Sequence, residues 1–241
     1  MRVVSLVPSV TETLLAWGVV PVACTRFCEQ PDLRHVGGTK DPDIEAIVGL
    51  APDLVVMCDE ENRRADATAL EAAGIVVHSC SPRSVADVRP ALDALARAVS
   101  ADPGDRAPQA DPPPLGLRAF VPIWRRPWMS LAAGTYGSSV LEALGVANVF
   151  ADHPDRYPQV TLEEASALRP DVVLLPDEPY PFRPRHHAEL AAVAPVVPVD
   201  GQDLFWWGVR TPDAIRRLHG AIGASTREGG PTHRSGGQTW G

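Results

Sequence analysis

The chain has 241 residues, of which 45% are hydrophobic and 22% are charged. This is the composition of an ordinary globular protein, long enough for one large domain or for two lobes with cores of their own. The formal net charge of −8 disfavours nucleic acids and anionic membrane surfaces as partners, because both require a basic footprint on the protein.

The N-terminus predicts a strand over residues 2–6, directly after Met1. The apolar run is too short for an export signal, and the acidic Glu12 follows it closely. No apolar stretch approaches the roughly 20 residues that a membrane-spanning helix needs. These features predict a cytoplasmic protein with no membrane insertion.

Cysteine usage agrees with a reducing compartment. The four cysteines, Cys24, Cys28, Cys58 and Cys80, are expected to be reduced and buried. A metal shared by Cys24 and Cys28 is the weaker alternative, because no second pair of ligands accompanies them in the sequence.

The elements alternate along the chain. Strand-like runs cover residues 2–6, 20–24, 54–58, 76–79, 119–123, 172–175 and 196–199. Helical patterns lie between them, and this alternation predicts an α/β fold with parallel sheets.

Several helix ends carry recognisable signals. A capping box at Ser9–Glu12 is predicted to open the first helix, which Gly18 ends, and Thr161–Glu164 repeats the box. Gly74 and Gly145 are expected to end helices. Residues 84–99 predict a longer helix with one apolar face.

Composition divides the chain into parts. Residues 101–116 are rich in proline and have no apolar periodicity, which predicts a linker. We therefore expect an N-terminal α/β lobe (1–83), an interlobe helix and linker (84–116), a C-terminal α/β lobe (117–223) and a disordered Gly/Ser/Thr-rich tail (224–241).

A repeat supports the two-lobe interpretation. Residues 44–60 and 162–178 share a short helix, a Leu-x-Pro-Asp turn, an apolar strand and a final acidic pair. Ligands of open α/β sheets bind beyond the carboxyl ends of the strands, so two facing lobes would point Asp59, Glu60, Asp177 and Glu178 into one cleft. The alternative is that Pro-Asp before a Val-rich strand is common loop chemistry.

The candidate ligand-binding residues lie in loops after strands. The N-terminal lobe offers Lys40 and the run Asp59, Glu60, Glu61, Asn62 and Arg63, which could equally be a solvated helix N-terminus. The C-terminal lobe offers Trp124, Trp128, Tyr136, Tyr157, Asp177, Glu178, Tyr180, Phe182, Trp206, Trp207 and Arg210. Loop aromatics beside charges favour a ligand site, and the alternative is that they pack the seam between the lobes.

The sequence lacks the common catalytic motifs. The sequence has no G-x-S-x-G elbow, no phosphate-binding glycine loop and no H-E-x-x-H metal motif. No nucleophilic side chain can be matched with a general base from the sequence, so no catalytic residue is assigned. A binding protein is therefore favoured over an enzyme.

Several motifs resemble one known family. The opening Arg2–Glu12, the strand over 52–56 and the duplicated lobe resemble the class III periplasmic binding proteins, which include cobalamin-binding and ferric-siderophore-binding components of ABC importers. The resemblance covers roughly residues 1–223. Three shorter motifs resemble a narrower group, the leaderless bacterial proteins known as helical-backbone metal receptors or cobalamin-binding proteins. These motifs are residues 60–63, 124–129 and 177–182.

This resemblance implies two Rossmann-like lobes, bridged by one long helix, with the ligand between them. The family's permease-facing glutamates correspond to positions near Arg64 and Gly208, neither acidic, which makes permease coupling doubtful. The expected ligand is a corrinoid such as cobalamin, or another metal chelate of unspecified metal. Aromatic residues would cover its apolar surface and the acidic pairs would meet cationic groups, amides or the metal itself. The alternatives are a chelatase-like enzyme using these carboxylates, or an interaction module without a small ligand.

Overall fold

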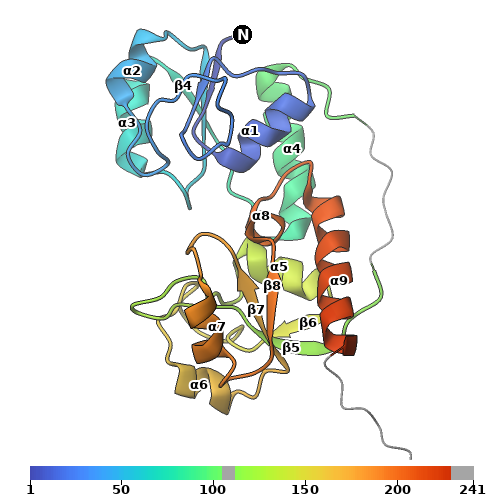
Figure 1. The fold of residues 1–241 in the computed structure, drawn as a ribbon. Coiled ribbons are helices and arrows are strands. Elements are labelled where there is room, and N and C mark those ends of the chain that lie inside the picture. The colour runs from blue at the N-terminus through green and yellow to red at the C-terminus, as the bar shows by residue number, and fades with distance from the viewer. Residues whose placement is uncertain (105–111, 229–241) are drawn as a thin grey trace, which may run out of the picture.

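The protein forms two stacked lobes in the computed structural model, which describes residues 1–104 and 112–228 (Figure 1). Each lobe contains a four-stranded parallel sheet, and the two sheets have equivalent strand orders, β2-β1-β3-β4 and β6-β5-β7-β8. The predicted α/β fold with two parallel sheets is therefore confirmed.

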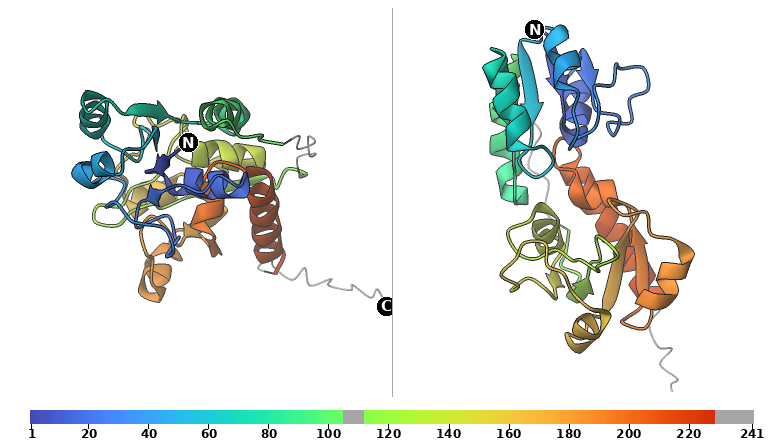
Figure 2. Two further views of the ribbon diagram at one scale, coloured as in Figure 1. Left: turned by 90° about the horizontal axis from the view of Figure 1, so that it is seen from above. Right: turned by 90° about the vertical axis from the view of Figure 1, so that its left-hand side faces the viewer.

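The N-terminal lobe alternates strands and helices. Its strands are β1 (Val3–Ser5), β2 (Ala23–Cys24), β3 (Leu54–Met57) and β4 (Val76–Ser79), and its helices are α1 (Pro8–Ala16), α2 (Ile44–Gly49) and α3 (Arg64–Ala72). Helix α4 (Val85–Val99) then runs to the junction with the second lobe, as the right-hand view in Figure 2 shows.

The C-terminal lobe repeats this order. Its strands are β5 (Leu117–Phe120), β6 (Val146–Asn148), β7 (Val172–Pro176) and β8 (Val196–Val199). Its helices are α5 (Tyr136–Ala143), α6 (Leu162–Ala167), α7 (Pro184–Leu190), α8 (Gly201–Phe205) and α9 (Thr211–Glu228). No helix in the described part of the chain is long and apolar enough to cross a membrane.

The sequence repeat is also a repeat of hydrogen bonds. The Asp53 carboxylate accepts the Arg2 backbone N–H at 2.6 Å, and Asp171 accepts the equivalent N–H of Arg118 at 2.7 Å. The Arg2 guanidinium donates to Leu50 O at 2.9 Å, and that of Arg118 donates to Leu168 O at the same distance. The Pro-Asp motif thus ties the turn before the third strand of each sheet to the first strand.

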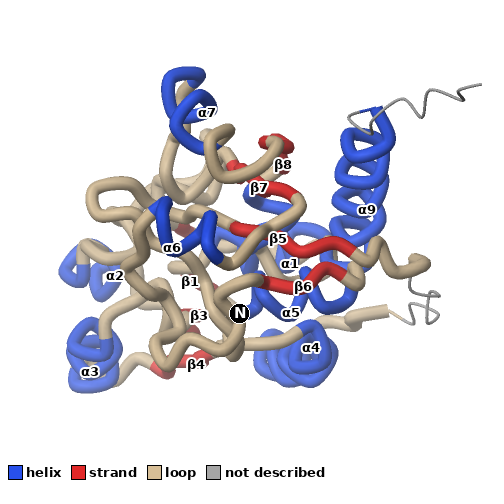
Figure 3. Tube along the Cα trace, turned by 90° about the horizontal axis from the view of Figure 1, so that it is seen from below, coloured by secondary structure: helices blue, strands red, loops and turns tan. Residues whose placement is uncertain are grey.

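Helices cover both faces of each sheet (Figure 3). In the N-terminal lobe, Ile47 of α2 and Leu70 of α3 pack on one face with Val55. In the C-terminal lobe, Ala165 of α6 and Leu190 of α7 pack on one face with residues such as Val173. The remaining faces of the two sheets contribute to one larger core.

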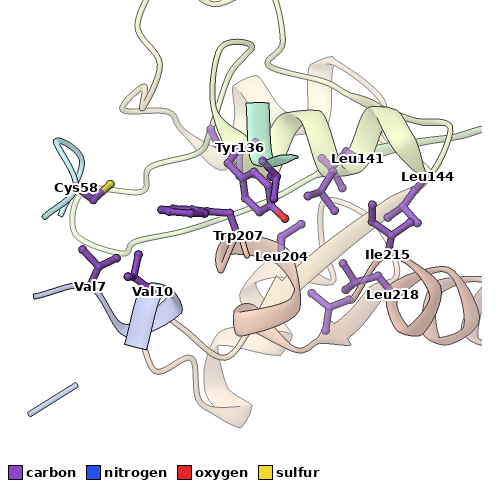
Figure 4. Close-up of a cluster of buried hydrophobic side chains, with 14 of the residues drawn as sticks. Val7, Val10, Cys58, Tyr136, Leu141, Leu144, Leu204, Trp207, Ile215 and Leu218 are labelled. Carbon is purple, nitrogen blue, oxygen red and sulfur yellow. The ribbon is translucent and has the colours of Figure 1, made fainter. Parts of the chain in front are cut away.

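This larger core joins the lobes. It combines Val7 and Val10 of the N-terminal lobe, Leu95 of α4, and Leu141 and Ile215 of the C-terminal lobe. Trp207 is 4% exposed and lies between Val7 and Val10 on one side and Tyr136 on the other (Figure 4). The junction is therefore packed like a protein interior and not like a hinge between independent domains.

Some predicted helix ends and strands are corrected by the structure. Helix α1 begins at Pro8, one residue before the predicted cap, and Val7 at its N-cap makes no side-chain cap bond. Proline suits the first turn because its missing N–H would have no helical partner there. The Thr161–Glu164 capping box is confirmed. Strand β6, which is too short to show alternation, was not predicted.

The linker and tail differ in outcome. The described residues 101–104 and 112–116 contain no helix or strand, as expected, and the rest of that linker lies outside the described residues. The expected disordered tail from residue 224 is wrong for its first five residues, because α9 continues to Glu228. The remaining tail, 229–241, lies outside the described residues.

Candidate functional site

The loop after β3 contacts Arg156 and Tyr157 in the loop after β6, and the loop after β7 carries the second acidic pair. We use the term interlobe seam for Glu29, Glu60 and Glu61 of the N-terminal lobe together with Arg156, Tyr157, Glu178 and Gln202 of the C-terminal lobe. Both acidic loops follow the carboxyl ends of parallel strands, the position at which α/β sheets bind ligands.

Glu60 bridges the two lobes. Its Oε2 accepts a hydrogen bond from the Tyr157 hydroxyl at 2.8 Å, and its Oε1 is paired with the Arg156 guanidinium. Burial, reinforced by the Glu60 charge, raises the pKa of the Tyr157 phenol. Tyr157 thus acts as a neutral donor at the seam.

Glu61 lies beside Glu60 in a poorly solvated position. Burial is the main cause that raises the pKa of its carboxyl to about 7, and the negative charges of Cys28, Glu178 and Glu60 act in the same direction. Glu178 belongs to the other lobe, so this electrostatic contribution acts across the interlobe seam. Lys40 opposes the shift, and its ammonium group also donates to Glu60 O at 2.7 Å.

Glu178 is held by an aromatic residue. Its Oε1 accepts a hydrogen bond of 2.7 Å from the Trp206 indole N–H. Burial raises the pKa of Glu178, with Asp177, Glu29 and Asp200 contributing repulsion. A Cβ at Gly201 would lie 2.9 Å from the Glu178 backbone nitrogen, so α8 can approach this loop only because residue 201 is glycine.

Aromatic rings cluster behind Glu178 in the C-terminal lobe. Tyr180 packs edge-on against Trp124 with centroids 5.2 Å apart, and lies 4.8 Å from Phe182, which stacks on Trp128 at 6.1 Å. Trp124 remains 43% exposed. These four predicted site residues therefore form one partly open aromatic surface.

Other predicted residues serve their own lobe. The Asn62 side chain accepts from Cys58 N and donates to Leu6 O and Thr39 O, which fixes the loop after β3. Asp59 accepts from the Ser79 hydroxyl at 2.8 Å, and Asp177 from Gly201 N at the same distance. Arg63 is the exposed N-cap residue of α3.

That the two acidic pairs contact a ligand or its metal stays a prediction. In the described part of the protein, no group of three or more His, Cys, Asp or Glu side chains is arranged to hold a metal ion. Asp59 and Asp177 are hydrogen-bonded within their own lobes, whereas Glu60 and Glu178 lie at the interlobe seam.

Tyr136, Trp207 and Arg210 take part in the packing between the lobes, and their predicted contact with a ligand stays a prediction. Tyr136 is buried and its hydroxyl lies 2.9 Å from Thr211 Oγ1. Arg210 bonds Glu12 of α1 at 2.8 Å and Asp203 of α8 at 3.3 Å. For these three residues, the alternative that loop aromatics and charges pack the seam describes the structure.

The sequence did not single out Glu29, Arg156 and Gln202 as site residues. Gln202 Nε2 donates to Glu29 Oε1 at 3.1 Å across the seam. These residues stand outside any recognisable motif, and their partners are remote in the chain. Only Arg156, directly before Tyr157, has a local signal, since a charge beside a loop aromatic often marks a surface in use.

Sequence comparisons link the chain to known proteins. A family model described as "Periplasmic binding protein" matches residues 3–110. The Vitamin B12-binding protein of Vibrio cholerae serotype O1 is 27% identical over 193 residues, covering 71% of this chain and 69% of the relative. A Vitamin B12-binding protein of Yersinia pestis is 27% identical over 197 residues, covering 72% and 69%.

Solved structures share the fold over nearly the whole chain. The periplasmic vitamin B12 binding protein BtuF of Vibrio cholerae has a TM-score of 0.73 at 22% identity, covering 94% of this chain and 98% of that one. The periplasmic heme-binding protein BhuT, solved with two hemes, has a TM-score of 0.76 at 24% identity, covering 93% and 98%.

These relatives overturn one expectation. The predicted cytoplasmic location is wrong by this comparison, because the solved proteins of the same fold are periplasmic binding proteins. A short apolar run near the first residue was not a sufficient criterion for the compartment. The resemblance to the class III periplasmic-binding-protein-like family is confirmed, by sequence over residues 3–110 and by fold across the described parts of both lobes.

Proposed function

We propose that this protein binds a metal-containing tetrapyrrole at the interlobe seam, and that the preferred ligand is a corrinoid such as cobalamin. The observation that carries the proposal is the excess of carboxylates at the seam beside a partly open aromatic surface. Glu29, Glu60, Glu61 and Glu178 are opposed there by Arg156 and Lys40.

Charge separates the two ligand classes found among the relatives. A corrinoid carries peripheral amides, whose N–H groups donate to carboxylates, whereas heme carries two propionates that carboxylates repel. Poor solvation already raises the pKa of Glu61 and Glu178, so further negative charge at the seam would be unfavourable. The seam therefore suits a neutral, amide-bearing macrocycle.

The aromatic surface supplies the apolar contact. Trp124, Tyr180 and Phe182 lie in a chain of ring contacts next to Glu178, and Trp206 bonds that carboxylate directly. Flat macrocycles bury large areas against such rings. Glu60, Tyr157 and Trp206 are the residues we assign to ligand contact, with Glu61 and Glu178 setting the preferred charge.

The test is a pair of titrations followed by visible absorption and calorimetry, one with cyanocobalamin and one with hemin. We expect cyanocobalamin to bind stoichiometrically and more tightly than hemin. Replacing Glu61 and Glu178 together by glutamine should narrow this preference, because it removes repulsion of the propionates. Glu163→Gln is the control, since Glu163 lies exposed on α6 away from the seam.

Three results would refute the proposal. Tighter binding of hemin than of cyanocobalamin by the unmodified protein would show that heme, and not a corrinoid, is the preferred ligand. Binding of neither ligand would contradict the proposal that the protein binds a tetrapyrrole. Chemical turnover of a tetrapyrrole would favour the chelatase-like alternative. The relatives named above are binding proteins, which agrees with retention of the ligand.

A further inference from the structure

All four cysteines lie along the edge of the N-terminal sheet that faces the other lobe. Cys24 ends β2, Cys58 follows β3, Cys80 follows β4, and Cys28 lies in the turn after β2. All four are buried and unpaired. They differ sharply in their surroundings, and none of them is assigned to ligand contact.

The turn after β2 brings two of these thiols together. Cys28 N donates to Thr25 O at 3.1 Å, so the chain makes a tight turn directly after Cys24. The Cys24 and Cys28 thiols lie close enough to shift each other's pKa. Only three residues separate them in sequence, so joining them closes a very short loop.

Hydroxyl groups surround the Cys28 sulfur. Thr25 Oγ1 lies 3.2 Å from Cys28 Sγ and already accepts the Phe27 backbone N–H at 3.3 Å, which leaves its own proton for the sulfur. Thr11 Oγ1 is also 3.2 Å from Cys28 Sγ, although its single proton is shared with Val7 O at 3.1 Å. Such donors stabilise a thiolate.

The two sulfurs are consequently unequal. The hydrogen bond from Cys24 is the main cause that lowers the pKa of Cys28, assisted by the two threonines, while the same hydrogen bond and burial raise the pKa of Cys24. One thiolate and one neighbouring protonated thiol are the two components of a dithiol that undergoes exchange.

We propose that Cys24 and Cys28 form a reversible intramolecular disulfide by thiol–disulfide exchange with a disulfide oxidant. The Cys28 thiolate attacks one sulfur of the oxidant, forming a mixed disulfide and releasing one thiolate. Cys24 then loses its proton and attacks the Cys28 sulfur, forming the Cys24–Cys28 bond and releasing the second thiolate. The protein dithiol loses two electrons and two protons, and the oxidant disulfide is reduced to two thiols.

The surroundings are compatible with this exchange. Cys28 is 3% exposed, but it lies in a turn whose neighbours Arg26, Phe27 and Glu29 are exposed, so a local opening of the turn uncovers its sulfur. The vitamin B12 and heme binding proteins that share this fold are periplasmic in Vibrio cholerae, and the bacterial periplasm favours disulfides.

Cys58 and Cys80 provide an internal comparison. They follow neighbouring strands and are buried to a similar extent. Burial raises the pKa of Cys58 to about 11 and that of Cys80 to about 12, so both are protonated near neutral pH and are poor nucleophiles. The inference thus predicts oxidation of one cysteine pair and not of the other.

The sequence allows a direct readout in the native protein. Trypsin cleaves after Arg26, between the two cysteines, and the four cysteines fall on four different tryptic peptides. The folded protein is incubated with oxidised glutathione, quenched in acid, alkylated after unfolding and digested. We expect peptides 3–26 and 27–34 to be joined, to separate on reduction, and Cys58 and Cys80 to be alkylated.

Single substitutions test the order of the two steps. Cys24→Ser should stop the reaction at a glutathione mixed disulfide on Cys28, and Cys28→Ser should leave Cys24 unmodified. Cys80→Ser is the matched control and should still give the joined peptides. The joined peptides of the unsubstituted chain do not depend on the folding of any variant.

Three outcomes would contradict the formation of a Cys24–Cys28 disulfide. Complete alkylation of Cys24 and Cys28 in the unsubstituted protein, a Cys58–Cys80 link formed first, or a mixed disulfide on Cys28 that is never resolved by Cys24 would each overturn the inference. Binding of cyanocobalamin or hemin plays no part in this readout, so the dithiol and the ligand proposal can fail separately.

Discussion

Glu60 of the N-terminal lobe accepts a hydrogen bond of 2.8 Å from the hydroxyl of Tyr157 in the C-terminal lobe, although 97 positions separate the two residues. The same carboxylate pairs with Arg156. Together with the bond between Gln202 and Glu29, it ties the exposed parts of the two lobes above their common core. The seam is therefore held by a few polar contacts that can be tested individually.

The Glu60–Tyr157 bond should show energetic coupling. In a double-mutant cycle of Glu60→Ala and Tyr157→Phe, we expect a coupling of about 1 kcal/mol in the free energy of unfolding, because Tyr157 is 39% exposed and water competes for the carboxylate. Urea denaturation of the four proteins measures it. Additive effects of the two substitutions would show that the bond contributes nothing.

The aromatic residues near Glu178 should carry most of the affinity for the ligand. Replacing Trp206 or Tyr180 by alanine should weaken cyanocobalamin binding about thirty-fold, equivalent to about 2 kcal/mol per anchor. Calorimetric titration measures this loss. Leu168→Ala is the control, because Leu168 is also partly exposed but lies after α6. Unchanged affinity in both aromatic variants would place the ligand elsewhere.

The repeated elements could be predicted from the sequence because their signals are local. Alternation, the Thr161 capping box and the repeated Pro-Asp turn each involve residues close in the chain, and the structure shows them. Strand β6 could not be predicted, because its three residues, Val146–Asn148, are too few to show a period of two. It forms because the edge of β5 is available to pair with it.

The site was harder to predict, because side-chain roles depend on contacts between distant segments. Trp207 and Trp206 are adjacent in sequence, yet one is buried in the interlobe core and the other bonds Glu178 at the seam. Arg210 looks like a ligand-binding cation in sequence, but Glu12 and Asp203 engage it in the structure. No local pattern distinguishes these alternatives.

Glu61 should make stability depend on pH. Its carboxyl has a pKa of about 7 in the folded protein against an ordinary 4.5, so the folded state binds the proton more tightly than the unfolded state. The contribution of Glu61 to the free energy of unfolding therefore falls as pH rises from 4.5 to 7, and changes little above that range.

Urea denaturation at several pH values, compared between the unsubstituted protein and Glu61→Gln, isolates this effect. The stability of the unsubstituted protein relative to the variant should decline through the window and then level off. Glu163→Gln, on exposed α6, should run parallel to the unsubstituted protein. A parallel course for Glu61→Gln as well would mean that Glu61 titrates normally.

Trp207 should contribute more to stability than any aromatic residue of the open surface, because it fills the core that both lobes share. Trp207 is 4% exposed between Val7 and Val10 of the N-terminal lobe and Tyr136 of the C-terminal lobe, whereas Trp124 is 43% exposed. Truncation of a buried tryptophan leaves a cavity, so Trp207→Ala should lower the free energy of unfolding by about 3–5 kcal/mol. Trp124→Ala should change it by about 0.5 kcal/mol or less, as is usual for an exposed side chain.

Urea denaturation of both variants, with Trp207→Phe as an intermediate that fills part of the cavity, gives the comparison. Equal effects of Trp207→Ala and Trp124→Ala would contradict a shared core, and the lobes would then have to be held together by the polar contacts of the seam alone.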